Sequence, residues 1–313
     1  MTLILNGQKN AVRIDEMRDN SRKNFISFYI ERKVKMGNIK IYAFADEADS
    51  NIDGQIKAMK RNELDGLEIR GVDGENISDI TLEKANEVKS KLEANGLIIW
   101  SIGSPIGKIN INEDFEPHIE KYKHTLDVAA VLGAENIRMF SFYIPKEIKP
   151  ADCKEEVIER IGKFVEIAKG TGINLCHENE KGIYGDIPER CLEIHKAIPE
   201  LKGIFDPANY VQCGIDTLKG WELLKDYIYY MHIKDSKSDG FVVPAGMGDG
   251  NVSAIVKDFI ARGGNSFTIE PHLTVFKGLE GLEQKGEETK MAFKYLDNNS
   301  AFDAACDAFK KII

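Results

Sequence analysis

The sequence predicts a (β/α)8 barrel, and three observations support this fold class. The chain has 313 residues, a length that large α/β barrels fill as one domain. Short apolar runs alternate eight times with longer amphipathic segments, the arrangement that gives a parallel sheet covered by helices. The first apolar run ends in Phe-Ala-Asp-Glu at 44–47 rather than in a glycine-rich phosphate loop. An open nucleotide-binding sheet is therefore disfavoured.

The first 35 residues precede this pattern, so residues 1–35 are interpreted as an N-terminal extension and 36–313 as a single barrel domain. The extension carries eight Lys and Arg against four Asp and Glu, whereas the remainder is acidic. It has neither the cleavage site of a secretory signal nor the acid-poor composition of a mitochondrial presequence. Met36 is a candidate initiator, and we expect the extension to be dispensable.

Eight short apolar runs are the predicted strands. They lie at residues 39–44, 66–70, 97–102, 136–141, 173–178, 203–206, 228–233 and 267–270. Short joints precede three of these runs: Asn95-Gly96 and Thr171-Gly172 come directly before theirs, and Gly263-Gly264 comes two residues before the last run. Connections of this length keep neighbouring strands adjacent in a sheet.

The intervening segments have helical periodicity. In the segment after Asp114, apolar residues follow one another at spacings of four, three, four and four: Phe115, Ile119, Tyr122, Leu126 and Ala130. This spacing places them on one face, and Asp114 can cap the first turn. The stretch 78–93 repeats the pattern and ends before Asn95-Gly96, a left-handed stop.

Composition and charge exclude several classes of protein. The chain is 42% hydrophobic and 30% charged, without any apolar stretch of the ~20 residues that a membrane span needs. Its net charge of −9 disfavours nucleic-acid binding. Five cysteines without a Cys-x-x-Cys pair indicate reduced thiols and a cytoplasmic protein rather than a disulfide framework or zinc ribbon. We expect no membrane partner, and association into a homo-oligomer is left open.

Metal-ligating residues collect at the ends of the last four predicted strands. The sequences there are His177-Glu178-Asn179-Glu180, Asp206-Pro-Ala-Asn209, His232-Ile-Lys234-Asp235 and Glu270-Pro-His272. The carboxyl ends of barrel strands converge, and active sites occur there. Three carboxylates and one imidazole suit one divalent ion, either Mn, Mg, Co or Zn. The predicted ligands are Glu178, Asp206, His232 and Glu270.

Strand parity separates the candidates within the first of these clusters. Cys176, Glu178 and Glu180 share one face of the strand, while His177 and Asn179 share the other. His177 is therefore interpreted as structural and Glu180 as a substrate contact, although a shift of register would exchange Glu178 and Glu180. Other residues near strand ends complete the candidate substrate-binding set: Glu68, Ser104, Lys108, Arg138, Asn209, Lys234 and His272.

Several of these features have a second interpretation. Arg138 and Lys108 either hold substrate oxygens or form interior ion pairs with Glu68 or Glu47. The segment 246–250, Gly-Met-Gly-Asp-Gly, is either an anion-binding loop or a flexible active-site loop. Three further histidines fall on predicted helices and are expected at the surface or in packing: His118, His124 and His195.

The strand-end motifs resemble those of the sugar phosphate isomerase/epimerase superfamily of xylose isomerase-like barrels. The likeness includes Phe44-Ala-Asp-Glu47, Ser104-Pro-Ile-Gly-Lys108, Arg138 to Tyr143 and Pro244 to Gly250, and so covers about 36–290. It implies one divalent metal on Glu178, Asp206, His232 and Glu270. It also implies that Glu178 and Glu270 form an acid/base pair that works through an enediolate on a sugar or sugar phosphate, which agrees with the chemistry of such a site.

Two other functions stay open within this fold. The superfamily also contains endonuclease IV-like repair nucleases with three zinc ions, and a barrel can bind a sugar-like ligand without converting it. The chain has six histidines and an acidic body, which does not suit a nuclease. Asn209 stands where relatives often have histidine. Its side chain can form a hydrogen bond with a substrate hydroxyl but, unlike histidine, cannot titrate.

Overall fold

A computed structural model describes residues 39–281 and 289–313 of the chain. The predicted extension, residues 1–35, lies outside the described residues. The described part contains the compact unit that begins at Lys40 and runs to Ile313. All eight predicted strands belong to this unit.

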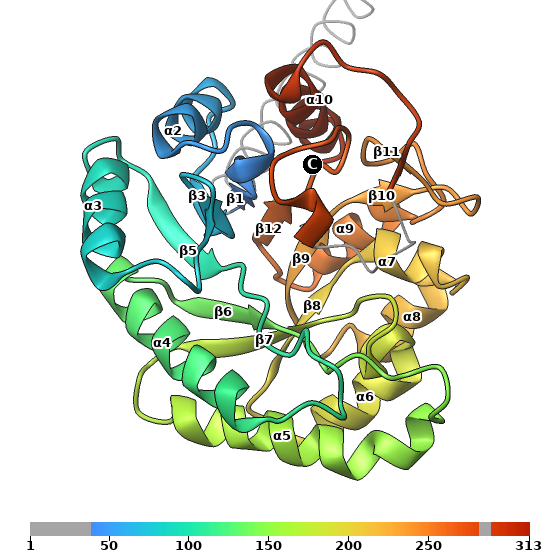
Figure 1. The fold of residues 1–313 in the computed structure, drawn as a ribbon. Helices are drawn as coiled ribbons and strands as arrows, with labels where there is room; N and C mark the ends of the chain where they lie inside the picture. The colour runs from blue at the N-terminus through green and yellow to red at the C-terminus, as the bar shows by residue number, and fades with distance from the viewer. Residues whose placement is uncertain (1–38, 282–288) are drawn as a thin grey trace, which may run out of the picture. The chain divides into compact units, whose positions relative to one another are not determined.

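The eight strands form a closed parallel barrel, which confirms the predicted fold class (Figure 1). The strands are β1 (Lys40–Ala43), β2 (Gly66–Ile69), β5 (Ile98–Ile102), β6 (Asn136–Met139), β7 (Asn174–Glu178), β8 (Lys202–Phe205), β9 (Ile228–Ile233) and β12 (Ser266–Ile269). Their order around the barrel follows the sequence, and β12 closes the sheet against β1. Residues 40–43 pair with residues 266–269 in this closure. The predicted strands agree with these bounds to within two residues.

Helices lie outside the ring of strands (Figure 1). They are α2 (Ile52–Arg61), α3 (Leu82–Glu93), α4 (Glu116–Leu132), α5 (Lys154–Ala168), α6 (Pro188–Ala197), α7 (Pro207–Gln212), α8 (Thr217–Leu224), α9 (Val252–Ala261) and α10 (Asn298–Lys310). Short 3-10 turns supplement them at η1 (Ala45–Glu47), η2 (Pro150–Cys153), η3 (Tyr184–Asp186) and η4 (Leu279–Gly281). None of the described helices is both long and apolar enough to cross a membrane.

Two predicted helices differ from the structure at their first turn. The helix expected from residue 78 begins at Leu82, because the Thr81 side chain accepts a hydrogen bond from the backbone of Lys84 and caps it there. The Asp114 side chain accepts a hydrogen bond from the backbone N–H of Glu116, the first residue of α4. Asp114 is therefore not the N-cap, and the helix starts two residues after it. The helix ends at Leu132, and Gly133 follows it in the left-handed conformation with a φ of 73°.

Two small sheets outside the barrel were not predicted. A hairpin of β3 (Gly71–Val72) and β4 (Glu75–Asn76) follows β2. A second sheet of β10 (Asp235–Ser236), β11 (Phe241–Val243) and β13 (Lys290–Met291) follows β9. Both extend the barrel at the carboxyl ends of its strands, and the second fixes the segment that follows His232.

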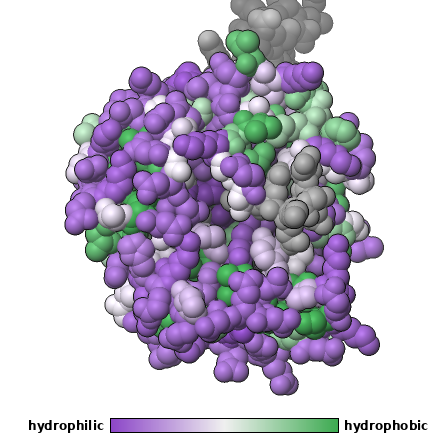
Figure 2. All heavy atoms as spheres, in the orientation of Figure 1, coloured by the Kyte–Doolittle hydropathy of each residue, from purple (hydrophilic) through white to green (hydrophobic). Residues whose placement is uncertain are grey.

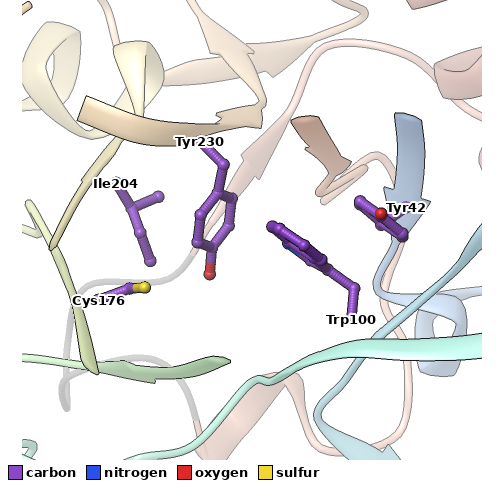
Figure 3. Close-up of a cluster of buried hydrophobic side chains, with 5 residues drawn as sticks. All are labelled: Tyr42, Trp100, Cys176, Ile204 and Tyr230. Carbon is purple, nitrogen blue, oxygen red and sulfur yellow. The ribbon is translucent and has the colours of Figure 1, made fainter. Parts of the chain in front are cut away.

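A layer of apolar side chains fills the barrel interior below the candidate site (Figure 3). It consists of Tyr42, Trp100, Cys176, Ile204 and Tyr230, and the rings of Tyr42 and Trp100 stack with centroids 4.8 Å apart. Successive inward-pointing residues of a strand are two apart. The next inward positions on three of these strands are therefore residues 178, 206 and 232. The apolar layer thus forms the floor of the polar cluster.

The outer surface has the opposite character. Figure 2 shows a face that is mainly hydrophilic, with isolated hydrophobic residues between charged ones. This distribution is normal for a globular domain, and single exposed apolar residues need no functional explanation.

Candidate metal centre

Four side chains from the last four barrel strands meet above the apolar floor. Glu178 ends β7, Asp206 follows β8, His232 lies near the end of β9 and Glu270 follows β12. All four are buried, and one ligand atom from each lies within 4.8 Å of the other three. The structure brings together the four residues that the sequence predicted as ligands.

The ends of β7 and β8 are joined by side chain to backbone hydrogen bonds. The Asn179 amide donates to the carbonyl of Asp206 at 2.9 Å, and its oxygen accepts from the Asp206 backbone N–H at 2.9 Å. Asp206 Oδ1 then accepts from the backbone of Asn209 and caps α7. Asp206 Oδ2 is left facing the cluster. Asn179, which the sequence analysis missed as a positioning residue, thus holds a candidate ligand in place.

His232 stands in the middle of the site with both ring nitrogens in contact with carboxylates. Its Nδ1 lies 2.9 Å from Glu178 Oε1 and 3.5 Å from Glu270 Oε2. Its Nε2 lies 3.0 Å from Glu68 Oε2 on the far side of the ring. Glu68 was expected to contact substrate, but it is fully buried behind His232 and outside the ligand set.

The electrostatic environment shifts the pKa values of the three carboxyl groups in different directions. Burial raises the pKa of Asp206 to about 7, against the opposing effect of the Lys234 ammonium. Burial also opposes charge on Glu178 and Glu270, yet both have lowered pKa values. His232 and Arg138 lower that of Glu178, whereas Lys234 and His272 lead the lowering at Glu270. Both glutamates are thus held as carboxylates.

Three buried cations surround the ligands. Arg138 Nη1 lies 3.3 Å from Glu178 Oε2, and Arg70 Nη1 lies 3.4 Å from Glu270 Oε1. Lys234 Nζ lies 3.1 Å from Asp206 Oδ2 and 3.2 Å from Glu270 Oε2. Of the two interpretations left open for Arg138, the interior ion pair forms, but with Glu178 and not with Glu68 or Glu47, because the strand order places Arg138 on β6 next to Glu178 on β7.

Lys108 and Glu180 form a second pair at the rim of the site. Lys108 Nζ lies 2.7 Å from Glu180 Oε1 and 4.4 Å from the centre of the Phe140 ring. The two side chains are 10% and 19% exposed, so they face the solvent side of the cluster. Lys108 thus forms an ion pair, one of the two interpretations left open for it, but not with Glu68 or Glu47, which contact His232 and Arg70 instead.

Three further residues predicted to contact substrate form contacts within the protein: Ser104, Asn209 and His272. Ser104 Oγ donates to the carbonyl of Arg138 and accepts from the backbone of Ile106, so it supports the loop. Asn209 Nδ2 donates to the Asn179 carbonyl at 2.9 Å and lies 3.4 Å from Glu178 Oε1. His272 lies beside the ligands, with Nδ1 3.5 Å from Glu270 Oε1.

A second group of possible ligands shares one residue with the first. Glu47, Glu270 and His272 also bring their ligand atoms within 4.8 Å of one another. Arg70 already supplies a cation there, since its Nη2 lies 3.0 Å from Glu47 Oε1. Burial raises the pKa of Glu47 to about 8, which reduces the negative charge further. The Arg70 guanidinium thus takes the place that a cation would have in this second group.

The glycine-rich segment binds an anion that belongs to the chain itself. The backbone N–H groups of Gly246, Gly248 and Gly250 donate to the Asp235 carboxylate at 2.9, 2.9 and 3.0 Å. A methyl group on Gly248 would lie 2.3 Å from Asp235 Oδ1. Of the two interpretations left open, the segment is thus an anion-binding loop, but its anion is the Asp235 carboxylate and its amides are not available to a substrate phosphate.

Besides His272, four histidines lie outside the ligand set. His177 points away from the barrel interior and contacts Ser141, which agrees with its expected structural role. His118 and His195 are buried against helices, and His118 Nε2 accepts from the backbone of Gly107. His124 contacts the carbonyl of Ile80. All three helical histidines serve packing.

The donor set fits a divalent cation. Three carboxylates and one imidazole are ligands that Mg, Mn, Co and Zn accept. Glu178 Oε2 and Asp206 Oδ2 are buried and make no hydrogen bond, although each lies near a cationic group. Buried carboxylate oxygens without hydrogen bonds are uncommon unless a charge compensates for them. A cation among the four residues would complete their coordination.

Comparison with known proteins identifies the family. Residues 56–294 match the family model described as xylose isomerase-like TIM barrel. The chain belongs to this family. The resemblance stated from the strand-end motifs is thereby confirmed. No curated protein sequence matches the chain.

Solved structures share the barrel with low sequence identity. A probable 3-DHS dehydratase, AsbF, from Bacillus anthracis is 17% identical, with a TM-score of 0.67 over 87% of this chain and 99% of that one. The IOLI protein, determined with a zinc atom, is 15% identical, with a TM-score of 0.66 over 88% and 98%. D-psicose 3-epimerase with D-tagatose, from Clostridium cellulolyticum H10, is 15% identical, with a TM-score of 0.64 over 88% and 98%. At this identity the likeness establishes the fold alone.

Proposed function

We propose that this chain is a divalent-metal-dependent isomerase or epimerase of a small sugar-like substrate, and that it moves a proton between carbon and protein through an enediolate. The observation that carries the proposal is the buried cluster of Glu178, Asp206, His232 and Glu270 at the carboxyl end of the barrel. Active sites of such barrels lie at this end. The D-psicose 3-epimerase structure with D-tagatose supports a sugar-like substrate.

The two glutamates are suited to act on one carbon from different sides. Glu178 ends β7 and Glu270 follows β12, and these two strands are separated in the barrel by β8 and β9. One glutamate removes the proton from the substrate carbon, and the other returns it. A divalent cation held by the four residues supplies positive charge that acidifies a carbon-bound hydrogen next to a substrate carbonyl. Arg138 and Arg70 orient the two carboxylates through their outer oxygens.

Other polar groups around the cluster are suited to hold substrate hydroxyls. Lys108 and Glu180 form a partly exposed pair above the site, and Lys234 contacts two of the ligands. Asn209 and His272 lie beside Glu178 and Glu270. Hydroxyl groups accept hydrogen bonds from ammonium groups and donate them to carboxylates. The set can therefore orient a polyhydroxylated molecule.

The test compares metal content and proton exchange in two variants. Glu178→Gln and Glu270→Gln each keep a coordinating oxygen but cannot accept a proton from carbon near neutral pH. We expect each to retain some metal and to lose turnover by roughly 10²–10⁴-fold, the contribution of general acid/base catalysis. The measurements are mass spectrometry of bound metal and incorporation of deuterium from solvent into a panel of ketoses. Glu93→Gln, on the outside of α3, is the control.

The outcomes distinguish the three functions open to this fold. One metal with solvent exchange at a sugar carbon supports the isomerase or epimerase. Three zinc ions with cleavage of abasic DNA would indicate a nuclease, and metal without turnover of any ketose would indicate a binding protein. Wild-type turnover in both glutamate variants would assign the proton transfer to other residues, with Glu180 as the next candidate.

A further inference from the structure

We propose that Glu68 is a positioning residue that fixes the imidazole of His232 so that its Nδ1 faces the three other ligands. The inference rests on the metal centre of the proposed function, and it gives a role to a residue outside the ligand set. Glu68 lies on β2, which is not one of the four strands that carry the ligands.

The geometry around His232 defines this role. Glu68 Oε2 lies 3.0 Å from Nε2, while Glu178 Oε1 lies 2.9 Å from Nδ1. An imidazole that donates Nε2–H to a carboxylate keeps the lone pair of Nδ1 for a cation. The edge-on ring of Phe44, at a centroid distance of 5.3 Å, packs against the same imidazole. Glu68 therefore determines which ring nitrogen is available, and Phe44 restricts the tilt of the ring.

Glu68 is itself held in place by hydrogen bonds to its other carboxylate oxygen. Its Oε1 accepts from the Tyr230 hydroxyl at 2.9 Å, and Ser101 Oγ lies 3.3 Å from the same oxygen. Tyr230 precedes His232 by two residues on β9, so both point into the barrel, and Figure 3 shows the Tyr230 hydroxyl within the interior. The strand that carries the imidazole thus also carries a donor to the carboxylate that orients it.

The burial of Glu68 makes a purely structural role a poor explanation. The residue is 0% exposed, and its ion-pair partner is His232. A buried carboxylate is costly unless it is paired, and an apolar residue of similar volume often replaces a buried ion pair without loss of stability. A carboxylate at this position is therefore best explained by its contact with His232, the histidine that it orients. Carboxylates that hold metal-binding histidines in this way contribute about 10–100-fold to metal affinity.

The experiment measures Mn²⁺ affinity of the full chain after removal of metal. We expect Glu68→Leu to weaken Mn²⁺ binding by about 10–100-fold. Glu68→Gln keeps an acceptor for Nε2–H but loses the charge, so we expect about a tenfold loss at most. Tyr230→Phe leaves the Glu68 carboxylate in place and should change affinity by less than about threefold, since the carboxylate keeps its contact with His232 Nε2 and the hydrogen bond from Ser101. Tyr122→Phe, which removes a buried hydroxyl without a hydrogen-bond partner, is the control.

A second measurement separates positioning from stability. The visible spectrum of the Co²⁺-loaded protein reports the ligand field, which a merely structural role of Glu68 would not alter. We expect Glu68→Gln and Glu68→Leu to shift the cobalt bands, with Tyr122→Phe unchanged. If Glu68→Leu does not fold, Glu68→Gln decides the question by the same two measurements.

The inference fails if the folded Glu68 variants bind Mn²⁺ within twofold of the wild type and keep its cobalt spectrum. In that case the metal centre would still stand if His232→Ala abolished binding. If the wild type bound no divalent cation, both the inference and the metal centre would be wrong. Absence of proton exchange with ketoses, together with weakened Mn²⁺ binding in the Glu68 variants, would overturn only the proposed reaction.

Discussion

Lys234 is the residue whose position has the most direct consequence for metal binding. Its ammonium lies within 3.2 Å of oxygens of both Asp206 and Glu270. It is nearly fully buried, and the pKa of this lysine is raised by both carboxylates although burial opposes its charge. A divalent cation on the same oxygens would be repelled by this ammonium at short range. Lys234 both stabilises the carboxylates and competes for them.

Substitution of Lys234 tests this dual role. Lys234→Met should lower the melting temperature of the metal-free protein, because two buried carboxylates lose a cation. At pH 8.5 it should tighten Mn²⁺ binding by about tenfold, which corresponds to about 1.4 kcal/mol of removed repulsion. Calorimetric titration and thermal unfolding measure both effects. Lys108→Met is the control, because Lys108 pairs with Glu180 rather than with a ligand. Weaker binding in Lys234→Met would show that the ammonium organises the site instead.

His118 gives the stability of the protein a defined pH dependence. Burial lowers the pKa of His118 to about 4, and its Nε2 accepts from the backbone of Gly107. The unfolded chain takes up this proton near pH 6.5, whereas the folded chain does not. The contribution of His118 is therefore present above pH 6.5 and is lost as the pH falls toward 4.

The pH effect is measured by urea unfolding at pH 7.5 and 5.5 in the presence of a chelator. When the pH falls from 7.5 to 5.5, the free energy of unfolding should decrease by about 1 kcal/mol less in His118→Gln than in the wild type, since the glutamine does not titrate. The comparison cancels the contributions of the other titrating groups. An identical pH dependence in both proteins would mean that His118 takes up its proton equally in the folded and unfolded chains, against the lowered pKa.

At the scale of elements, the segment after β9 is organised around Asp235. The backbone amides of three glycines converge on this carboxylate and fix the loop that leads to α9. Burial raises the pKa of Asp235 against the lowering by these amides. Successive backbone N–H groups form anion-binding concavities. Here the concavity is closed by a side chain from β10, which anchors the loop beside Lys234.

Substitutions in the loop test this anchor. Asp235→Asn replaces the anionic acceptor and should cost about 1.5–3 kcal/mol of unfolding free energy. Gly248→Ala should cost about 1–3 kcal/mol, because its methyl group would lie 2.5 Å from the Ser236 carbonyl oxygen. Gly162→Ala, where nothing lies within 4 Å, should stabilise α5 by about 0.5–1 kcal/mol. Urea unfolding measures all three. Equal stabilities for Gly248→Ala and Gly162→Ala would contradict the predicted close packing.

At the scale of the whole molecule, the unit from Lys40 to Ile313 contains every strand of the barrel. Closure is made by β1 and β12, and α10 packs near α2 beside this seam (Figure 1). Arg61 on α2 forms an ion pair with Asp303 on α10 at 2.8 Å. Phe302 and Phe309 on α10 are fully buried. The C-terminal helix thus completes the unit.

Removal of residues 1–35 tests the prediction that the extension is dispensable. The chain that starts at Met36 keeps all barrel strands, so we expect its melting temperature to stay within about 2 °C of the full chain, a change of less than ~1 kcal/mol. Mn²⁺ affinity should be unchanged. Differential scanning calorimetry and titration provide the measurements. A large fall in melting temperature would show that the extension stabilises the barrel or an interface.

The meeting of Glu178, Asp206, His232 and Glu270 could be predicted from the sequence because their positions follow from local rules. Each lies at the end of an apolar run, and the carboxyl ends of parallel barrel strands converge. Strand parity placed Glu178 inside and His177 outside, as the structure confirms. The helical periodicity around Tyr122 likewise predicted α4. Each of these features depends on residues that lie close together along the chain, within one strand or one helix.

The sequence by itself thus determined the barrel, the end at which its polar residues gather and the chemistry of the ligand set. The tertiary structure alone decided the partners of each charge: Arg138 with Glu178, Glu68 with His232, and Asp235 with its glycine loop. Such pairings join residues up to 164 positions apart. Their geometry depends on the order and register of strands around the closed sheet, and no local pattern of residues encodes that register.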